Sequence, residues 1–197
     1  MIRVERAGLA DMAGVYRVCL LTGDAGADAS ALYPDPELPG HVYAGPYLAQ
    51  GSGTQLVAVD EGGVAGYIIS TDDTVAFAAW AEKHWWPPLR LRYPLIDEDT
   101  PSGRIIRLIH QPGSPSHEVL AEYPAHFHID LLERTRGSGL GRTLVFRLLA
   151  ELRERRVPGV HMGVDASNTN ASGFYEHLGF RALESDSLGL TMGMPLG

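Results

Sequence analysis

The chain is poor in the residues that build disulfides, basic surfaces and membrane spans. It has 197 residues with a single cysteine, Cys19, a single lysine, Lys83, and a formal net charge of -8. One cysteine excludes an internal disulfide and any site with several cysteine ligands, so we expect Cys19 to be a small buried residue. The negative charge argues against a protein that grips nucleic acid, because that contact needs clustered Lys and Arg.

Long apolar runs are also missing, which argues against a transmembrane helix. Residues 1–5 alternate in polarity and carry charge, which indicates a strand and not a secretory signal. There is no internal repeat, low-complexity tract or break in composition. We therefore expect a cytoplasmic protein whose residues 1–197 form one domain.

Hydrophobic periodicity predicts alternating strands and helices. Apolar runs over 54–60 and 64–70 are separated by Glu61, Gly62 and Gly63, which is typical of a hairpin. After residue 125 the pattern runs strand, helix, strand, helix, strand, strand, which indicates an α/β layer architecture. The remaining predicted elements are a strand over 1–7 and a helix over 11–21.

Two long segments lack a regular pattern. Residues 24–53 are rich in Gly and Pro, and at most a short helix near 43–48 is expected there. Residues 74–123 form a longer excursion with a predicted helix over 75–84. A segment of this length either has its own structure or serves the function directly.

Three tryptophans lie close together in the second of these segments. Trp80, Trp85 and Trp86 have large apolar surfaces that favour burial. They either cover a small core within the excursion or form an aromatic wall of a ligand pocket, in which case Tyr43 and Tyr47 are candidate neighbours.

A glycine-rich loop joins a predicted strand to a predicted helix. Phe127, Ile129 and Leu131 alternate with polar residues over 126–132, which indicates a strand, and residues 136–141 (RGSGLG) follow it. The apolar stripe of the next helix consists of Leu144, Val145, Leu148, Leu149 and Leu152. Glycines at a helix start let a ligand approach the backbone, and the free amides with the helix dipole favour an anion such as pyrophosphate.

Two common phosphate loops do not fit these residues. A P-loop would need Gly in place of Arg136 and Lys in place of Arg142. A dinucleotide fingerprint that begins at Gly137 would need its third glycine at Arg142, and it would lie unusually late in the chain. A glycine-rich turn that merely joins strand to helix remains as the simpler alternative.

A family resemblance rests on two motifs. Arg136, Gly139 and Gly141 match the R/Q-x-x-G-x-G/A signature with which the GNAT superfamily of N-acetyltransferases binds acetyl-coenzyme A. Residues 168–180 (NTNASGFYEHLGF) resemble the GNAT pattern N-x-x-A-x-x-F-Y-x-x-x-G-F, one strand further along the chain. The resemblance covers 125–197, and the elements before residue 71 agree with it more loosely.

The resemblance implies a fold, a donor and an acceptor. The fold is the α/β (α+β) GNAT fold, a mixed and mostly antiparallel sheet with splayed fourth and fifth strands, flanked by helices, here with an insertion over 74–123 between strands three and four. The donor is acetyl-coenzyme A and the acceptor a primary amine of a small molecule or peptide, with no nucleic-acid or membrane partner. The residues that the resemblance places at the cofactor are Leu131, Leu132, Arg136, Gly137, Ser138, Gly139, Leu140, Gly141, Arg142, Thr143, Asn168, Ala171, Phe174 and Tyr175.

A closer likeness is to the GNAT-like domain that ends animal O-GlcNAcases. It rests on Gly66-Tyr67, on residues 85–87 (WWP) and on residues 123–130 (YPAHFHID). This likeness would explain the long excursion as a shared feature. The glycine loop is intact in this chain, which favours cofactor binding.

The resemblance also suggests roles for two residues of the second motif. Tyr175 stands where GNATs often place a tyrosine that protonates the departing coenzyme A thiolate. The alternative is that Tyr175 packs as a core residue. Asn168 is expected to meet the cofactor or, alternatively, to act as a plain helix cap.

The general base is harder to assign. Many GNATs supply a Glu from strand four, whose counterpart here is Ala125, which cannot accept a proton. Asp130 lies nearest to the expected thioester and is the first candidate, ahead of His126 and His128 on the same strand face. A carboxylate at Asp130 could equally anchor a backbone amide.

The pair His126 and His128 also invites comparison with a metal site. Two imidazoles on one strand face can share a zinc ion, but a third ligand is needed. His110, His161 and Asp130 are the available groups, and none stands at motif spacing. We therefore expect no metal.

Two functions of different classes follow. The first is an N-acetyltransferase in which the amine attacks directly within a ternary complex, and the intact Tyr175 favours it. The second is a catalytically silent acetyl-coenzyme A binding module that acts as a sensor or scaffold, which Ala125 and the O-GlcNAcase likeness favour.

Overall fold

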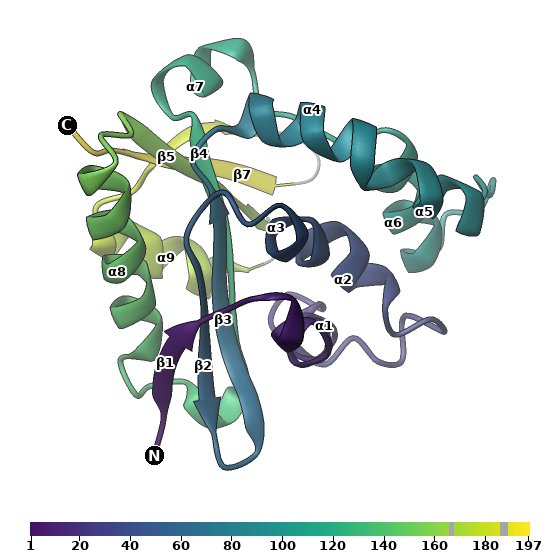
Figure 1. Cartoon of the computed structure of the whole chain (residues 1–197), viewed down its shortest axis with the longest axis horizontal. Coiled ribbons are helices and arrows are strands. Elements are labelled where there is room, and N and C mark those ends of the chain that lie inside the picture. The colour runs from purple at the N-terminus through teal and green to yellow at the C-terminus, as the bar shows by residue number, and fades with distance from the viewer. Residues whose placement is uncertain (166–167, 186–188) are drawn as a thin grey trace.

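A computed structural model describes residues 1–165, 168–185 and 189–197 of the chain (Figure 1). The strands are β1 (Arg3–Arg6), β2 (Gln55–Asp60), β3 (Gly63–Thr71), β4 (Ala125–Leu131), β5 (Gly159–Asp165), β6 (Arg181–Ser185) and β7 (Gly189–Pro195). The helices are α1 (Met12–Thr22), α2 (Leu38–Tyr43), α3 (Gly45–Gln50), α4 (Thr74–His84), α5 (Trp86–Arg92), α6 (Pro101–His110), α7 (His117–Glu122), α8 (Leu140–Glu154) and α9 (Thr169–Leu178).

The strands form one mixed sheet in the order β1-β2-β3-β4-β5-β7-β6. The hairpin expected around Gly62 is β2 and β3, and every neighbouring pair is antiparallel except β4 and β5, which are parallel. A parallel pair needs a crossover, and α8 supplies it between these two strands. The expected fold, with its insertion between the third and fourth strands, is confirmed.

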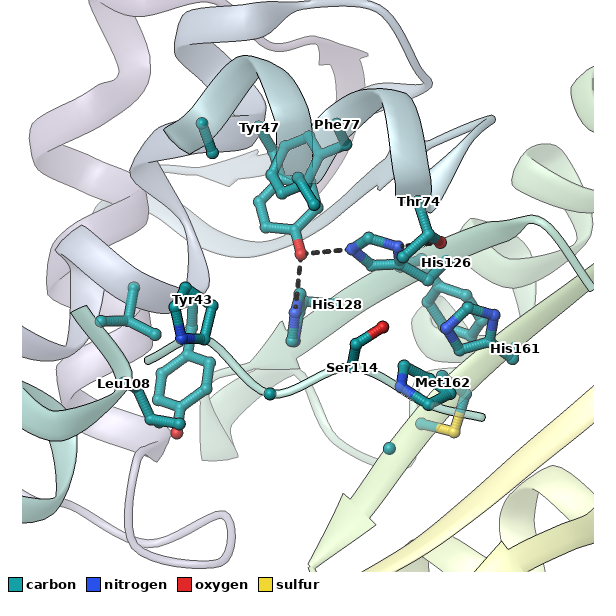
Figure 2. A pocket seen from close by; sticks show the side chains of 18 of the residues that line it. Tyr43, Tyr47, Thr74, Phe77, Leu108, Ser114, His126, His128, His161 and Met162 are labelled. Atoms are coloured by element: carbon teal, nitrogen blue, oxygen red, sulfur yellow. Dashed lines mark hydrogen bonds between the residues drawn. The ribbon is translucent and has the colours of Figure 1, made fainter. Parts of the chain in front are cut away.

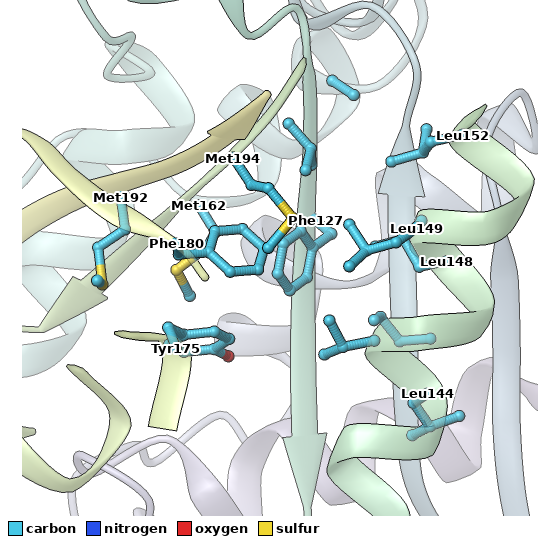
Figure 3. Packing of buried hydrophobic residues seen from close by; sticks show 14 of the residues in the cluster. Phe127, Leu144, Leu148, Leu149, Leu152, Met162, Tyr175, Phe180, Met192 and Met194 are labelled. Carbon is cyan, nitrogen blue, oxygen red and sulfur yellow. The ribbon is translucent and has the colours of Figure 1, made fainter. Parts of the chain in front are cut away.

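One face of the sheet packs against α8 and α9. The predicted apolar stripe of α8 is buried there, and Leu144, Leu148 and Leu152 are each fully buried. They meet side chains that alternate along the strands, such as Phe127 of β4 and Met192 of β7. Burial of this stripe gives the sheet its largest apolar cluster and fixes the start of α8 beside the end of β4 (Figure 3).

The opposite face packs against α1 and α3. Val57, Tyr67 and Ile69 point to this side because their strand neighbours point to the other, as the two-residue period of a strand requires. Cys19 of α1 is buried in this cluster, as expected, and burial raises the pKa of its thiol. Tyr47 of α3 is buried here as well.

The two segments without a regular pattern pack against each other. Residues 24–53 contain two short helices, α2 and α3, where at most one was expected. The sequence signal for them is weak because each helix is only six residues long and has a Gly or Pro in its first turn. The insertion forms α4, α5, α6 and α7. Leu38 of α2 packs with Trp86, Ile105 and Ile109 of the insertion in a third cluster.

The tryptophans therefore belong to a small core, which the insertion shares with α2. Trp86 is buried in that core, while Trp80 and Trp85 are partly buried against it. Trp86 also lines a cavity described below, so it serves both of the roles considered for it. No helix in the described part of the chain is long and apolar enough to cross a membrane.

We predict that truncating the centre of α8 destabilises the protein strongly. Leu148→Ala removes a fully buried side chain from the largest cluster and should lower the free energy of unfolding by about 2–5 kcal/mol. Phe146, on the same helix, is 44% exposed and provides the control, because Phe146→Ala should cost less than about 1 kcal/mol. Urea unfolding of the three proteins measures both values, and equal losses would contradict this account of the core.

Candidate active site at the divergence of two strands

The site lies where β4 and β5 separate. The two strands pair only through Ala125 with Val160 and His126 with His161, and β4 then continues beside β3 alone. Along β4 the backbone groups of successive residues point to opposite sides, so those of Ile129 and Leu131 point into the gap. A ligand in extended conformation can pair with this open edge.

Leu132, which the resemblance places at the cofactor, has both of its backbone groups engaged. Its amide donates to Ala65 O at 2.9 Å, and its carbonyl accepts from the amide and hydroxyl of Thr135 at 2.9 and 2.8 Å. The chain turns into the loop at this point, which uses up both groups. Ile129, which points into the gap instead, was missed because only the strand register decides which residues face it.

The glycine loop has the open backbone that the sequence predicts. Gly137 and Gly139 have φ of 74° and 78°, a region that favours glycine, and a Cβ atom built at either would meet nothing within 4 Å. At the start of α8 the Leu140 amide donates to the Ser138 hydroxyl at 3.4 Å, while Gly139 at the N-cap has no side chain to engage the next amides. The following amides, including that of Gly141, are thus left for an anion, together with the positive end of the helix dipole.

The other loop residues surround this backbone. The hydroxyl of Ser138 donates to Thr135 O at 2.6 Å, and that of Thr143 donates to Gly139 O at 3.1 Å. Leu140 is buried in the core, so only its backbone faces the loop. Arg142 is exposed with its guanidinium 5.0 Å from the centre of the Phe146 ring.

The second motif meets the first in space. Phe174 of α9 lies close to the loop, since a Cβ atom at Gly141 would stand 3.5 Å from its ring. Arg136 donates a hydrogen bond to the carbonyl of Gly26, and the amide nitrogen of Asn168 lies beside the same glycine. Residues from three distant parts of the sequence therefore converge at the start of α8.

Asn168 caps α9. Its side-chain oxygen accepts from the amide of Ala171 at 3.1 Å, so the plain helix cap is realised. This bond occupies the Ala171 amide, which leaves the Asn168 side-chain nitrogen as the group that is directed toward the loop region.

Tyr175 is buried between aromatic rings. Its ring packs edge-on against Phe127 and Phe180 in the main core (Figure 3) and against Phe174, which is exposed at the edge of that core. Its hydroxyl makes no hydrogen bond with any described residue. Because every fully buried polar side-chain atom of the described residues has a partner, this hydroxyl is not fully buried and reaches open space. Burial raises the pKa of Tyr175, which keeps the phenol protonated at neutral pH.

Asp130 is held away from the cavity by Tyr67. The Tyr67 hydroxyl donates to the Asp130 carboxylate, and Asp130 is not among the described residues that line the cavity. Burial raises the pKa of Asp130, while the hydrogen bond from Tyr67 opposes that shift. The anchor is a side-chain hydroxyl and not the backbone amide considered from the sequence.

A cavity of about 630 Å³ opens at the gap, on the face that carries α3 and α4 (Figure 2). His126 and His128 of β4 and His161 of β5 line it, and Phe127 reaches it through the gap from the opposite face. The cavity is roofed by the insertion, because the lining includes Phe77, Trp86, Leu108 and the segment from Pro112 to Pro115.

Four side chains in the cavity form a directed chain of hydrogen bonds. The hydroxyl of Thr74 donates to Pro124 O at 2.7 Å, so the Nδ1–H of His126 donates to that hydroxyl at 2.6 Å. His126 Nε2 then accepts from the Tyr47 hydroxyl at 2.6 Å, and the Tyr47 oxygen accepts from His128 Nε2 at 3.1 Å (Figure 2).

This arrangement leaves one nitrogen free to act as a base. With its proton on Nε2, His128 has an unprotonated Nδ1, which accepts no hydrogen bond from any described residue and is therefore open to the cavity. Burial and the neighbouring His161 lower the pKa of His128 to about 4, and burial lowers that of His126 well below its usual value. Both imidazoles are neutral at pH 7.

The three histidines do not gather a metal-binding set. Within residues 1–165, 168–185 and 189–197 there is no group of three or more His, Cys, Asp or Glu side chains placed to hold a metal ion. His161 turns its Nδ1 to the carbonyl of Tyr123, at 2.6 Å, and does not share a centre with His126 and His128.

Comparison with known proteins identifies the family. Residues 25–180 match the acetyltransferase (GNAT) family. The chain belongs to the GNAT family of acetyltransferases. Acetyl-coenzyme A is the acyl donor of that family.

Relatives are found in both solved structures and curated proteins. A crystal structure titled SsHAT is 33% identical with a TM-score of 0.89, covering 100% of this chain and 98% of that one. The ribosomal-protein-S18-alanine N-acetyltransferase of Escherichia coli shares the fold, with 17% identity, a TM-score of 0.55 and coverage of 100% and 95%.

The curated relatives match over a shorter stretch. A mycothiol acetyltransferase of Acidothermus cellulolyticus is 39% identical over 84 residues, which are 39% of this chain and 26% of that protein. One of Thermobifida fusca is 50% identical over 50 residues, which are 25% of this chain and 16% of that protein. The matched part thus spans only 26% and 16% of the length of these relatives.

We predict that the buried histidines make this GNAT protein sensitive to acid. Below pH 6.5 the unfolded chain protonates His126 and His128, whereas the folded chain protonates His128 only near pH 4, so stability falls as the pH drops between these values. The slope should be about 1.4 kcal/mol per pH unit for each histidine.

Urea unfolding at about pH 7.0, 5.5 and 4.5 measures how the free energy of unfolding changes with pH. The variant His128→Gln keeps an N–H donor for Tyr47 but cannot titrate, so its stability should fall less steeply than that of the wild type. Parallel slopes for the two proteins would show that His128 is not the group responsible.

Proposed function

We propose that this protein transfers an acetyl group from acetyl-coenzyme A to a primary amine of a small molecule or peptide, by direct attack in a ternary complex. The observation that carries the proposal is the meeting of two sites at the gap between β4 and β5. The glycine loop, residues 136–141, borders the gap on the face of the sheet that carries α8, and the cavity borders it on the opposite face. Phe127 touches both, since it packs on Tyr175 and lines the cavity.

The chain offers a group for each requirement of the donor. The free amides of the loop suit the pyrophosphate, and Arg136 and Arg142 add positive charge nearby. The backbone of Ile129 and Leu131 suits the extended arm that leads to the thioester. A backbone amide in the gap can also stabilise the oxyanion that forms when an amine attacks.

Tyr175 is our candidate for the acid that protonates the departing thiolate. The phenol stays protonated at neutral pH and so has a proton to give, although burial raises its pKa and makes it a weaker acid than an exposed tyrosine. The hydroxyl, without a partner among the described residues, is available for that purpose.

The proton that the amine loses needs an acceptor. Asp130 stays a candidate, but its carboxylate is engaged by Tyr67 outside the cavity. His128 faces the cavity with a free nitrogen, and through Tyr47 it connects to His126. These contacts favour His128 over Asp130 as the first acceptor.

A second candidate function is a silent module that binds acetyl-coenzyme A without turnover. Ala125 favours it, because it stands where many relatives carry a catalytic Glu. The likeness to the GNAT-like domain of O-GlcNAcases would favour it too. That likeness stays a prediction, since none of the relatives reported above is named as an O-GlcNAcase.

We predict that an acidic residue in the glycine loop strongly weakens the binding of acetyl-coenzyme A. Gly141→Asp places a carboxylate among the amides meant for pyrophosphate, and binding of acetyl-coenzyme A should weaken at least about tenfold. The fold should persist, because a carboxylate suits the first turn of a helix.

Isothermal titration with acetyl-coenzyme A measures this effect. Gly141→Ala is the matched control: it adds only a methyl group, 3.2 Å from a flexible end of Leu131, and should bind more tightly than Gly141→Asp. Undiminished binding by the Asp variant would place the donor elsewhere.

We predict that removing the Tyr175 hydroxyl lowers turnover without loosening donor binding. Tyr175→Phe keeps the ring in its aromatic cluster but removes the proton donor, so kcat should fall by roughly tenfold or more. Thiol release from acetyl-coenzyme A with a panel of amines measures kcat. An unchanged kcat would remove the acid role, and binding without turnover by the wild type would leave the silent module standing.

A further inference from the structure

The walls of the cavity are aromatic and apolar. Tyr43, Phe77 and Trp86 contribute rings from three helices, α2, α4 and α5, and Tyr47 adds a fourth from α3 (Figure 2). Leu108 of α6 and Met162 of β5 complete much of the remaining surface. A volume of about 630 Å³ accommodates a molecule larger than a single ring.

The described residues that line the cavity offer no free negative charge to a cation. Among the described residues that line it, Glu82 alone carries a formal charge at neutral pH. Its carboxylate is taken by Arg90 through two hydrogen bonds of 2.5 and 2.8 Å, and its side chain is 58% exposed at the rim. An ammonium group at the gap would therefore lose its water without gaining a free carboxylate partner among these residues, which is costly.

The polar groups near the gap suit a neutral amine instead. His126, His128 and His161 all have lowered pKa values because they are buried, so none adds charge. The free Nδ1 of His128 can accept a hydrogen bond from an amine N–H, and Ser114 lines the cavity from the insertion (Figure 2). The cavity thus pairs apolar walls with an uncharged hydrogen-bond acceptor.

We propose that this cavity binds an amine that is uncharged at neutral pH and is carried on an aromatic body, that is, an arylamine. The inference rests on the proposed acetyl transfer. In that reaction the amine nitrogen forms a bond to the thioester carbonyl carbon, and the carbon–sulfur bond breaks. The nitrogen loses one proton to the His128 side of the cavity, and the sulfur of coenzyme A gains one proton.

Two isomeric amines test the charge requirement. p-Toluidine and benzylamine have the same atoms, but the first is neutral at pH 7 and the second is protonated. With acetyl-coenzyme A as donor, kcat/KM for p-toluidine should exceed that for benzylamine by about tenfold or more, and putrescine, a dication, should react more slowly still. A preference for benzylamine or putrescine would overturn the proposal while leaving acetyl transfer itself intact.

A pair of variants tests the location. Ala78 of α4 lines the cavity and Ala79, beside it, is exposed and does not. Ala78→Phe should narrow the cavity and lower kcat/KM for p-toluidine by about tenfold, with the dissociation constant of acetyl-coenzyme A unchanged, whereas Ala79→Phe should behave as the wild type. Equal rates for the two variants would place the acceptor outside this cavity.

Binding separates this inference from the proposed function. Trp86 lines the cavity, so quenching of tryptophan fluorescence follows amine binding without any donor. If no amine is acetylated, the proposed function fails, yet the inference still predicts that p-toluidine binds about tenfold more tightly than benzylamine and that Ala78→Phe removes the difference. Equal or reversed affinities would overturn it.

Discussion

The separation of β4 from β5 after two residue pairs is the constraint on which the rest of the structure depends. In a fully paired sheet the backbone N–H and C=O groups of neighbouring strands bond to each other, whereas here the edge of β4 that faces away from β3 stays open. The open edge lies between the start of α8 and the cavity, so one break in a ladder creates both a place for the donor arm and a passage for the acceptor.

The histidines are the second consequence of that break. His126 and His161 form the last residue pair before the strands part, and His128 follows on the open stretch. Their hydrogen bonds to Tyr47 of α3 and Thr74 of α4 tie two helices to the sheet at the mouth of the gap. Because these rings are buried without a carboxylate partner, they stay neutral, and the site is held together by directed hydrogen bonds instead of charge.

The acceptor side is built by the two segments that look irregular in sequence. Leu38 from the first and Ile109 from the second are fully or almost fully buried in one cluster, so each segment gains its core from the other. That shared core holds Trp86 and Leu108 over the cavity. The donor side, in contrast, depends mainly on two short contiguous motifs, residues 136–141 and 168–180, which explains why the resemblance to GNAT proteins is clear there and silent about the acceptor.

The sequence by itself determined the sheet elements, the hairpin, the buried stripe of α8 and the glycine cradle, because each depends on residues close together in the chain. It also placed His126, His128 and Asp130 on one face of β4. Only the tertiary structure decided what each of them contacts. The Tyr67 hydroxyl donates to Asp130, while Tyr47 and Thr74 orient His126 and leave one nitrogen of His128 free toward a cavity. These partners lie 52 to 81 residues away along the chain, where no local pattern reaches.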